Sequence, residues 1–215
     1  FHRKVRSWLT MIGIFIGIAA VVSLIGLGEG LRSSIIGQFN LLGTDILSVQ
    51  ASGLDFAGPP GTAVVTPLTS DLTEKIEKVR GVDAAFDRYL QSGTMEFNDK
   101  QAIGFAASVP ENEDREVFYD ALNLKTETGR LLKDWDGRKV LLGNSFSEDE
   151  IFDKPIKVGD TVLLNDIKFQ VVGILERKGS FIIDGAVFLD ESVLLEDLRN
   201  LENRNEVNII AVKVK

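Results

Sequence analysis

The sequence predicts an α+β protein in which a long N-terminal helix crosses a membrane and a two-lobed domain follows it. Three observations support this prediction. Residues 7–28 form a run of 22 residues without Asp, Glu, Lys, Arg or His. Residues 45–90 and 186–214 each show the pattern of a strand, a helix and a second strand. Residues 91–185, between them, show short strands joined by turn signals.

The apolar run is long enough to cross a bilayer. As a helix it spans roughly 33 Å, against a hydrocarbon core of about 30 Å. Arg3, Lys4 and Arg6 precede the run, and Glu29 follows it. The positive-inside rule therefore predicts a cytoplasmic N-terminus in the cell (plasma or inner) membrane, with the residues after about 30 extracytoplasmic. A cleaved signal peptide is the alternative, but its apolar core is typically shorter, about 7–15 residues.

The helix is expected to continue beyond the membrane as a stalk, so that residues 1–43 form one element. Leu31, Ile35, Phe39 and Leu42 follow the spacing of a helix that packs one face against a partner. Gly43 then offers a helix stop. We therefore expect unbroken helix to about Leu42, with this stripe as the stalk packing face.

Glycines inside the run suggest close helix packing. Gly13 with Gly17, and Gly26 with Gly30, form two pairs spaced as small-xxx-small motifs, which let another helix approach closely. The alternative is that glycine is simply common in membrane helices. A nucleotide-binding loop at residues 26–30 is excluded, because no strand precedes it and the G-x-G-x-x-G spacing is missing.

The stretch RSWLTMIGIFIGIAAVVSLIGLGEGLRSSIIGQFNLLGTDILSV resembles the start of permease subunits of MacB/FtsX-type ABC transporters. More loosely, the resemblance covers the whole following region, which in that family is the MacB-like periplasmic core domain. The later match includes Gly159 and Asp160, whereas residues 146–152 depart from the family pattern. Asp45 stands where the family usually has Asn. The family continues into three more membrane helices, and whether the natural chain extends past Lys215 is left open.

The resemblance implies two lobes. Residues 44–90 and 186–215 would form a porter-like lobe whose two β-α-β units share one sheet, and residues 91–185 would form an inserted, mostly β lobe. Within these lobes we expect a loop at residues 52–67, a helix capped by Asp71, and a short helix at 145–152. Hairpin turns are expected at residues 98–99 and 165–166, where Asn-Asp separates β-rich runs.

No catalytic, cofactor-binding or metal site is predicted. The sequence has no Cys, no P-loop motif, and one histidine, His2, ahead of the apolar run. The carboxylates of residues 111–116 and 148–153 lack Ca²⁺-loop spacing and are expected to form solvated faces. Trp135 is expected to pack beneath the inserted lobe. Residues 33–215 hold 20 basic and 31 acidic residues, which argues against nucleic acid as a partner.

The resemblance implies a mechanotransmission role without cofactors, in export or substrate hand-over. Its expected partners are a separate ATP-binding subunit, a second permease copy as a homo- or heterodimer, and an extracytoplasmic adaptor, besides the lipid bilayer. Under this interpretation ATP hydrolysis occurs elsewhere and this chain is not an enzyme. Two alternatives stay open, a single-pass anchored interaction or sensor module and an FtsX-like regulator of cell-wall hydrolases.

Overall fold

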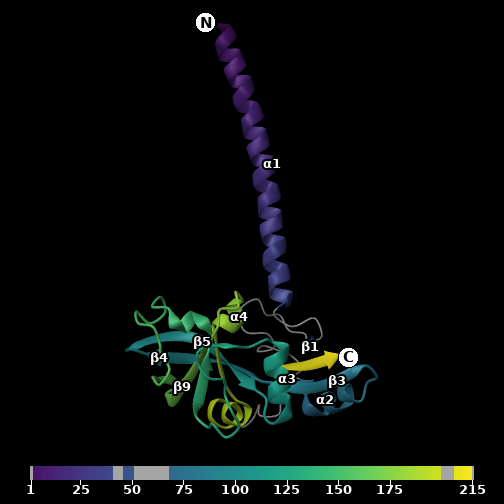
Figure 1. Cartoon of the computed structure of the whole chain (residues 1–215), viewed down its shortest axis with the longest axis vertical. Coiled ribbons are helices and arrows are strands. Elements are labelled where there is room, and N and C mark those ends of the chain that lie inside the picture. The colour runs from purple at the N-terminus through teal and green to yellow at the C-terminus, as the bar shows by residue number, and fades with distance from the viewer. Residues whose placement is uncertain (1, 41–45, 51–67, 200–205, 215) are drawn as a thin grey trace. The chain divides into compact units, whose positions relative to one another are not determined.

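The computed structural model describes residues 2–40, 46–50, 68–199 and 206–214 (Figure 1). The chain divides into two units, Phe1–Asn40 and Leu41–Lys215, and each is described by itself. We call the second the C-terminal unit. The loop expected at residues 52–67 and Leu42, the last residue of the expected stalk face, lie outside the described residues.

Helix α1 (His2–Asn40) is a single unbroken helix of 39 residues (Figure 1). At 1.5 Å per residue it is about 58 Å long. The prediction that Gly26, Gly28 and Gly30 are helical is confirmed. Each glycine costs up to about 1 kcal/mol of helix propensity. The absence of proline and the long apolar run allow the helix to continue through them.

A three-stranded sheet joins the two ends of the C-terminal unit. Its central strand is the last one among the described residues, and both outer strands run antiparallel to it. The order is β1 (Ile46–Gln50), β12 (Ile209–Val214) and β3 (Val82–Arg88). Helix α2 (Ser70–Glu77) contacts β3, and β2 (Leu68–Thr69) pairs with β11 (Glu206–Val207). The expectation that the first and last strands share a sheet is confirmed.

The remaining strands form a seven-stranded sheet that closes on itself. Its order is β6-β9-β7-β10-β5-β4-β8, and β8 also pairs with β9. Six strands therefore form a barrel without a free edge between them, and β6 is attached beside β9. The bounds are β4 (Leu90–Phe97), β5 (Lys100–Val109), β6 (Thr126–Gly129), β7 (Lys139–Leu142), β8 (Thr161–Leu164), β9 (Ile167–Leu175) and β10 (Ala186–Asp190).

Figure 1 shows β4, β5 and β9 toward one side of the C-terminal unit and β1, β3 and α2 toward the other, so the unit is two-lobed. One boundary predicted from the sequence does not follow the sheets. Strand β10, assigned to the same sheet as β12, pairs with β5 and β7 in the barrel instead. The β-α-β pattern gave the elements correctly but not this long-range pairing.

Both predicted hairpin turns are confirmed. Asn98 and Asp99 join β4 to β5 with φ of 53° and 58°, and Asn165 and Asp166 join β8 to β9 with φ of 46° and 67°. Positive φ at both central residues is the type I′ geometry, whose twist matches that of the flanking strands. Asn and Asp tolerate this left-handed conformation better than most residues.

The helices differ more from prediction. Instead of a helix over residues 145–152, there is one 3₁₀ turn, η1 (Asn144–Ser147). Helix α2 begins at Ser70 with Thr69 as its N-cap, so Asp71 lies in the first turn rather than at the cap. Helix α3 (Glu113–Ala121) was not predicted. The other helical segments are α4 (Phe181–Asp184), α5 (Glu191–Val193) and the π-helical η2 (Leu194–Leu198).

Two hydrophobic clusters lie on the two faces of the barrel strands. All six closed strands contribute to the first, which fills the barrel and includes Met95, Leu142 and Phe169. The second lies against helix α3 and includes Leu141 and Phe118. Neighbours Leu141 and Leu142 belong to different clusters because successive strand residues point to opposite faces.

Candidate functional site

The sequence-predicted packing residues lie on helix α1. Within the described residues, Met11–Gly30 is the one helical segment long and apolar enough to cross a membrane, and none of it is buried inside the chain. A Cβ atom added at Gly13, Gly17, Gly26 or Gly30 would meet nothing within 4 Å. Among the described residues, these four glycines therefore have no close neighbour.

Leu31, Ile35 and Phe39 are all within α1, where helical spacing places them on one face. The structure therefore places these three stalk residues in one helix. Their role as a packing face stays a prediction, as does the packing role of the four glycines.

The acidic run near residue 113 has a structural role. Glu113, Asp114 and Glu116 lie in the first turn of α3, where a carboxylate is favoured by the partial positive charge of the helix N-terminus. Among the described residues, no group of three or more His, Cys, Asp and Glu side chains is arranged to hold a metal ion.

A buried ion pair links helix α3 to the end of strand β10. Arg115 donates from Nη2 to Asp190 Oδ1 at 2.7 Å and from Nε to the Pro110 carbonyl at 2.9 Å. Both side chains are buried, at 6% and 4% exposure. Burial raises the pKa of Asp190, and the charge of Arg115 opposes that rise. The pair therefore fixes α3 to the barrel at a point where neither charge reaches much water.

Trp135 does not pack beneath the inserted lobe, as the sequence had suggested. Its side chain is 99% exposed, and its backbone has a φ of 67°. Asp136 braces the turn by accepting hydrogen bonds from both Nη atoms of Arg130 at 2.6 and 2.7 Å and from the backbone N of Lys133 at 2.8 Å. Chiefly because of Arg130, the pKa of Asp136 is held well below its usual range. A braced turn thus holds the ring outward.

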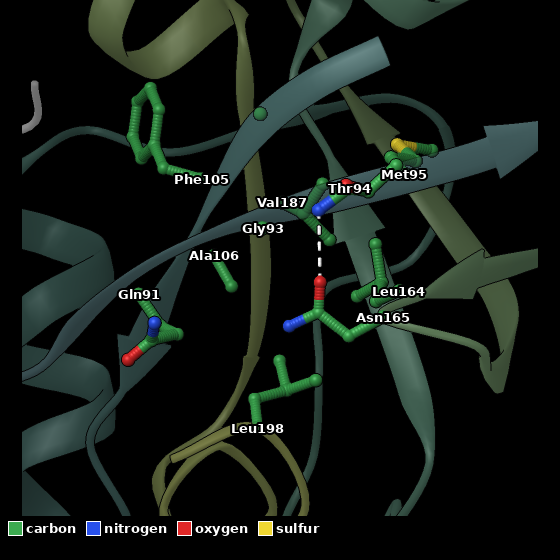
Figure 2. Close-up of a pocket in the computed structure, with 11 residues that line it drawn as sticks. Gln91, Gly93, Thr94, Met95, Phe105, Ala106, Leu164, Asn165, Val187 and Leu198 are labelled. Carbon is green, nitrogen blue, oxygen red and sulfur yellow. Dashed lines mark hydrogen bonds between the residues drawn. The ribbon is translucent and has the colours of Figure 1, made fainter. Parts of the chain in front are cut away.

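A small hollow beside the β8–β9 turn is too tight for a ligand (Figure 2). Its volume is about 20 Å³, close to the space one water needs. Asn165 Oδ1 accepts a hydrogen bond from the backbone N of Thr94 at 2.9 Å, as Figure 2 shows, and the Asn165 backbone N donates to the Thr94 carbonyl at 2.9 Å. A Cβ on Gly93 would lie 2.6 Å from Asn165 Oδ1. The hollow is part of how the barrel closes.

A larger cavity, the intersheet cavity, lies between the three-stranded sheet and the barrel. Its volume is about 210 Å³. Strands β1, β3 and β12 line one side, β5 and β10 the other, and α3 and α4 also contribute. Four phenylalanines form an apolar wall, and Arg88 is the one cation among the residues that line the cavity. The lining residues used below are Phe86, Phe105, Phe118, Phe188, Ser48 and Arg88. This cavity was not predicted from the sequence, although an arginine two residues after Phe86 in an alternating strand was a usable signal.

Beside Arg88, Glu191 gives the C-terminal unit a pH dependence. Burial raises the pKa of Glu191 from 4.5 to about 7, and the charges of Asp87 and Glu111 add to the shift. The folded state therefore holds a proton that the unfolded chain loses near pH 4.5. A raised carboxyl pKa means that stability is greatest at low pH and falls as the pH rises through the interval up to about 7.

We expect Glu191→Gln to remove this dependence. On going from pH 5 to pH 8, the unfolding free energy of the variant should rise by roughly 1–2 kcal/mol relative to that of the native chain, allowing for partial exposure of the side chain. Urea unfolding at the two pH values measures the difference. Glu150→Gln, at an exposed carboxylate, is the matched control and should give no such change. Equal shifts in both variants would show that burial of Glu191 is not the cause.

A family model for the MacB-like periplasmic core domain matches residues 7–215. An uncharacterized ABC transporter permease of Methanocaldococcus jannaschii is 31% identical over 215 residues, covering 100% of this chain and 51% of that protein. The macrolide export ATP-binding/permease protein MacB of Neisseria gonorrhoeae is 28% identical over 216 residues, covering 99% of this chain and 32% of that protein. The chain thus spans about half, or about a third, of the length of these relatives.

Two solved structures show the same fold. The periplasmic region of MacB from Actinobacillus actinomycetemcomitans aligns with a TM-score of 0.57 at 18% identity, over 82% of this chain and 77% of that one. The extracellular domain of the noncanonic ABC-type transporter YknZ from Gram-positive bacteria aligns with a TM-score of 0.55 at 15% identity, over 80% and 82%. The family model covers both the apolar helix, from residue 7, and the α+β two-lobed domain that follows it. The chain belongs to the MacB-like periplasmic core domain family.

Proposed function

We propose that this chain is part of a permease subunit that works by mechanotransmission. In this mechanism ATP binding on the cytoplasmic side moves helix α1, and the movement opens or closes an extracytoplasmic C-terminal unit to export or hand over a substrate. The observation that carries the proposal is the unbroken 39-residue helix, of which only Met11–Gly30 is needed to cross the bilayer. A helix that continues without a break is stiff enough to act as a lever.

The partner surfaces follow from helix α1. The four glycines with open space above them suit close approach by other membrane helices, including those of a second permease copy. The stripe of Leu31, Ile35, Phe39 and the expected Leu42 would pack a second stalk. We further propose that a separate subunit or domain binds and hydrolyses ATP, since the sequence has no P-loop motif. Residues 33–215 hold 20 basic and 31 acidic residues, which disfavours nucleic acid and anionic membrane surfaces as partners of the C-terminal unit.

Interrupting the helix beyond the span tests the lever. Ser33→Pro removes a helix hydrogen bond and costs roughly 3 kcal/mol or more in a helix interior, whereas Ser33→Ala keeps the helix. Both would be made in the full-length protein with its ATP-binding partner in nanodiscs. Because the sequence has no Cys, Asp149→Cys gives this chain one spin label at an exposed site. We expect ATP to change the distance between labels on two copies in the Ser33→Ala protein and not in Ser33→Pro.

An ATP-dependent change that persists in Ser33→Pro would contradict the lever. If no change occurs even with Ser33→Ala, although the partner hydrolyses ATP, the chain does not work by mechanotransmission. A single-pass sensor would then be the better interpretation.

A further inference from the structure

The intersheet cavity holds an arginine, Arg88, whose Nε makes no hydrogen bond. Arg88 and Phe86 point to the cavity side of strand β3, whereas Asp87 between them points to the other side and accepts a hydrogen bond from Thr73. Arg88 Nε is buried and has no hydrogen-bond partner. None of the ion pairs found among the described residues includes Arg88. A buried donor left in this state costs about 1–3 kcal/mol, and more when charged.

The ring of Phe118 stacks on the guanidinium of Arg88 but gives it no hydrogen-bond acceptor. The guanidinium carbon lies 3.9 Å from the ring centroid. Stacking of this kind stabilises the flat face of the cation but offers no acceptor to an N–H at its edge. Burial lowers the pKa of Arg88 to about 9, with the charge of Glu191 opposing that shift. Arg88 is therefore still charged at neutral pH, and what its Nε lacks is a hydrogen-bond acceptor.

The walls specify what should accompany that acceptor. Phe86, Phe105, Phe118 and Phe188 surround a space of about 210 Å³. An apolar cavity of about 150 Å³ is enough to bind benzene. An acceptor alone would leave most of this wall uncovered, so the ligand needs an apolar body. Residues 33–215 carry a large excess of acidic groups, and Glu191 acts on Arg88, so a single negative charge suits the site better than several.

We propose that the intersheet cavity binds a monoanionic amphiphile, a carboxylate on an apolar chain or ring system, with Arg88 as the group that receives its headgroup. A carboxylate is planar and accepts two parallel N–H bonds from one guanidinium edge, which is the edge that Nε occupies. The inference stands apart from the proposed lever, because binding requires neither ATP nor a partner subunit. It adds to the family assignment a ligand class and the residue that selects it.

Photo-crosslinking to the full chain in nanodiscs tests the proposal. The probe is a decanoate analogue with a diazirine at the end of its chain, and the labelled peptides are identified by mass spectrometry. We expect labelling of the peptides that contain Phe86 and Phe118, and competition by unlabelled decanoate. Decanol and decyltrimethylammonium, which have the same chain with a neutral and a cationic headgroup, should compete at least about tenfold less well, since a charge-assisted hydrogen bond contributes about 1.5–3 kcal/mol.

Three variants connect the signal to the site. Arg88→Gln should weaken decanoate binding about tenfold or more, and Arg88→Lys should recover part of it by restoring the charge. Ser48→Phe, at an exposed position of β1 that lines the cavity, should block binding while the folded state is kept. Arg177→Gln, at an arginine that is 73% exposed, is the matched control and should bind like the native chain.

Three other outcomes of these experiments would overturn the proposal. Labels found only on helix α1 would mean that the probe had merely entered the lipid. Equal competition by decanol would mean that Arg88 does not select the headgroup. Unchanged labelling in both Arg88→Gln and Ser48→Phe would place the probe outside the cavity.

Discussion

Replacing Asp190 with asparagine is expected to lower the unfolding free energy of the C-terminal unit by about 3–5 kcal/mol, because it removes the buried counter-charge of Arg115. A second carboxylate, Asp134, lies 3.3 Å from Arg115 Nη2, but its side chain is 44% exposed and does not replace the buried partner. Asp190 is also the N-cap residue of α5, but its side chain makes no capping hydrogen bond. The loss should therefore report on the ion pair rather than on the cap.

Asp197→Asn is the matched control for this prediction. Asp197 accepts two hydrogen bonds from Arg138, at 2.7 and 2.9 Å, but Arg138 is 60% exposed. Removing an ion pair near the surface should cost only about 0–1 kcal/mol. Urea unfolding of residues 41–215 compares the two variants. Similar losses in both would mean that burial does not determine the strength of the Arg115–Asp190 pair.

Gly173→Ala is expected to cost roughly 2–4 kcal/mol, because strand β9 has no space for a side chain there. A Cβ atom at this position would lie 2.2 Å from the carbonyl oxygen of Arg130 and 3.0 Å from the Leu141 side chain. The register between β7 and β9 also shifts at this point, between Val140 and Leu141. Backbone atoms on a neighbouring segment cannot move aside as the end of a side chain can.

Gly104→Ala is the matched control for Gly173→Ala. Gly104 is also in a barrel strand, β5, but a Cβ there would meet nothing within 4 Å. Since glycine inside a strand is less favourable than alanine by about 0.5–1 kcal/mol, this variant should be slightly more stable. Thermal unfolding followed by circular dichroism would show shifts of opposite sign. A stable Gly173→Ala protein would mean that β6 and β9 separate at little cost.

The sequence predicted the elements whose chemistry is local. Two Asn-Asp pairs identified both type I′ turns because the turn geometry depends on those residues alone. The apolar run identified α1 for the same reason. Helix α3 was missed because its first turn is acidic and one of its buried side chains is Arg115, so that its apolar face looks incomplete. The burial of that arginine becomes reasonable only once Asp190, far along the chain, is placed beside it.

Pairing between distant strands was harder to predict. Strand β10 has the composition of a fully buried strand, and nothing within residues 186–190 indicates whether β5 or β12 is its neighbour. The intersheet cavity was harder still to predict from the sequence, because it exists only where two sheets meet. Trp135 shows the opposite error, since a large aromatic residue is usually buried and only the bracing of its turn by Asp136 explains why this one faces outward.

The position of β12 at the centre of the three-stranded sheet has a consequence for how the protein is made. Synthesis proceeds from the N-terminus, so β1 and β3 emerge long before the strand that pairs with both. Neither can complete its hydrogen bonding until the last described residues have left the ribosome and reached the same compartment. Long-range pairing of this kind is slow. The barrel, whose six strands are all complete by Asp190, is free to form first, so we expect assembly of the three-stranded sheet to be the final step of folding.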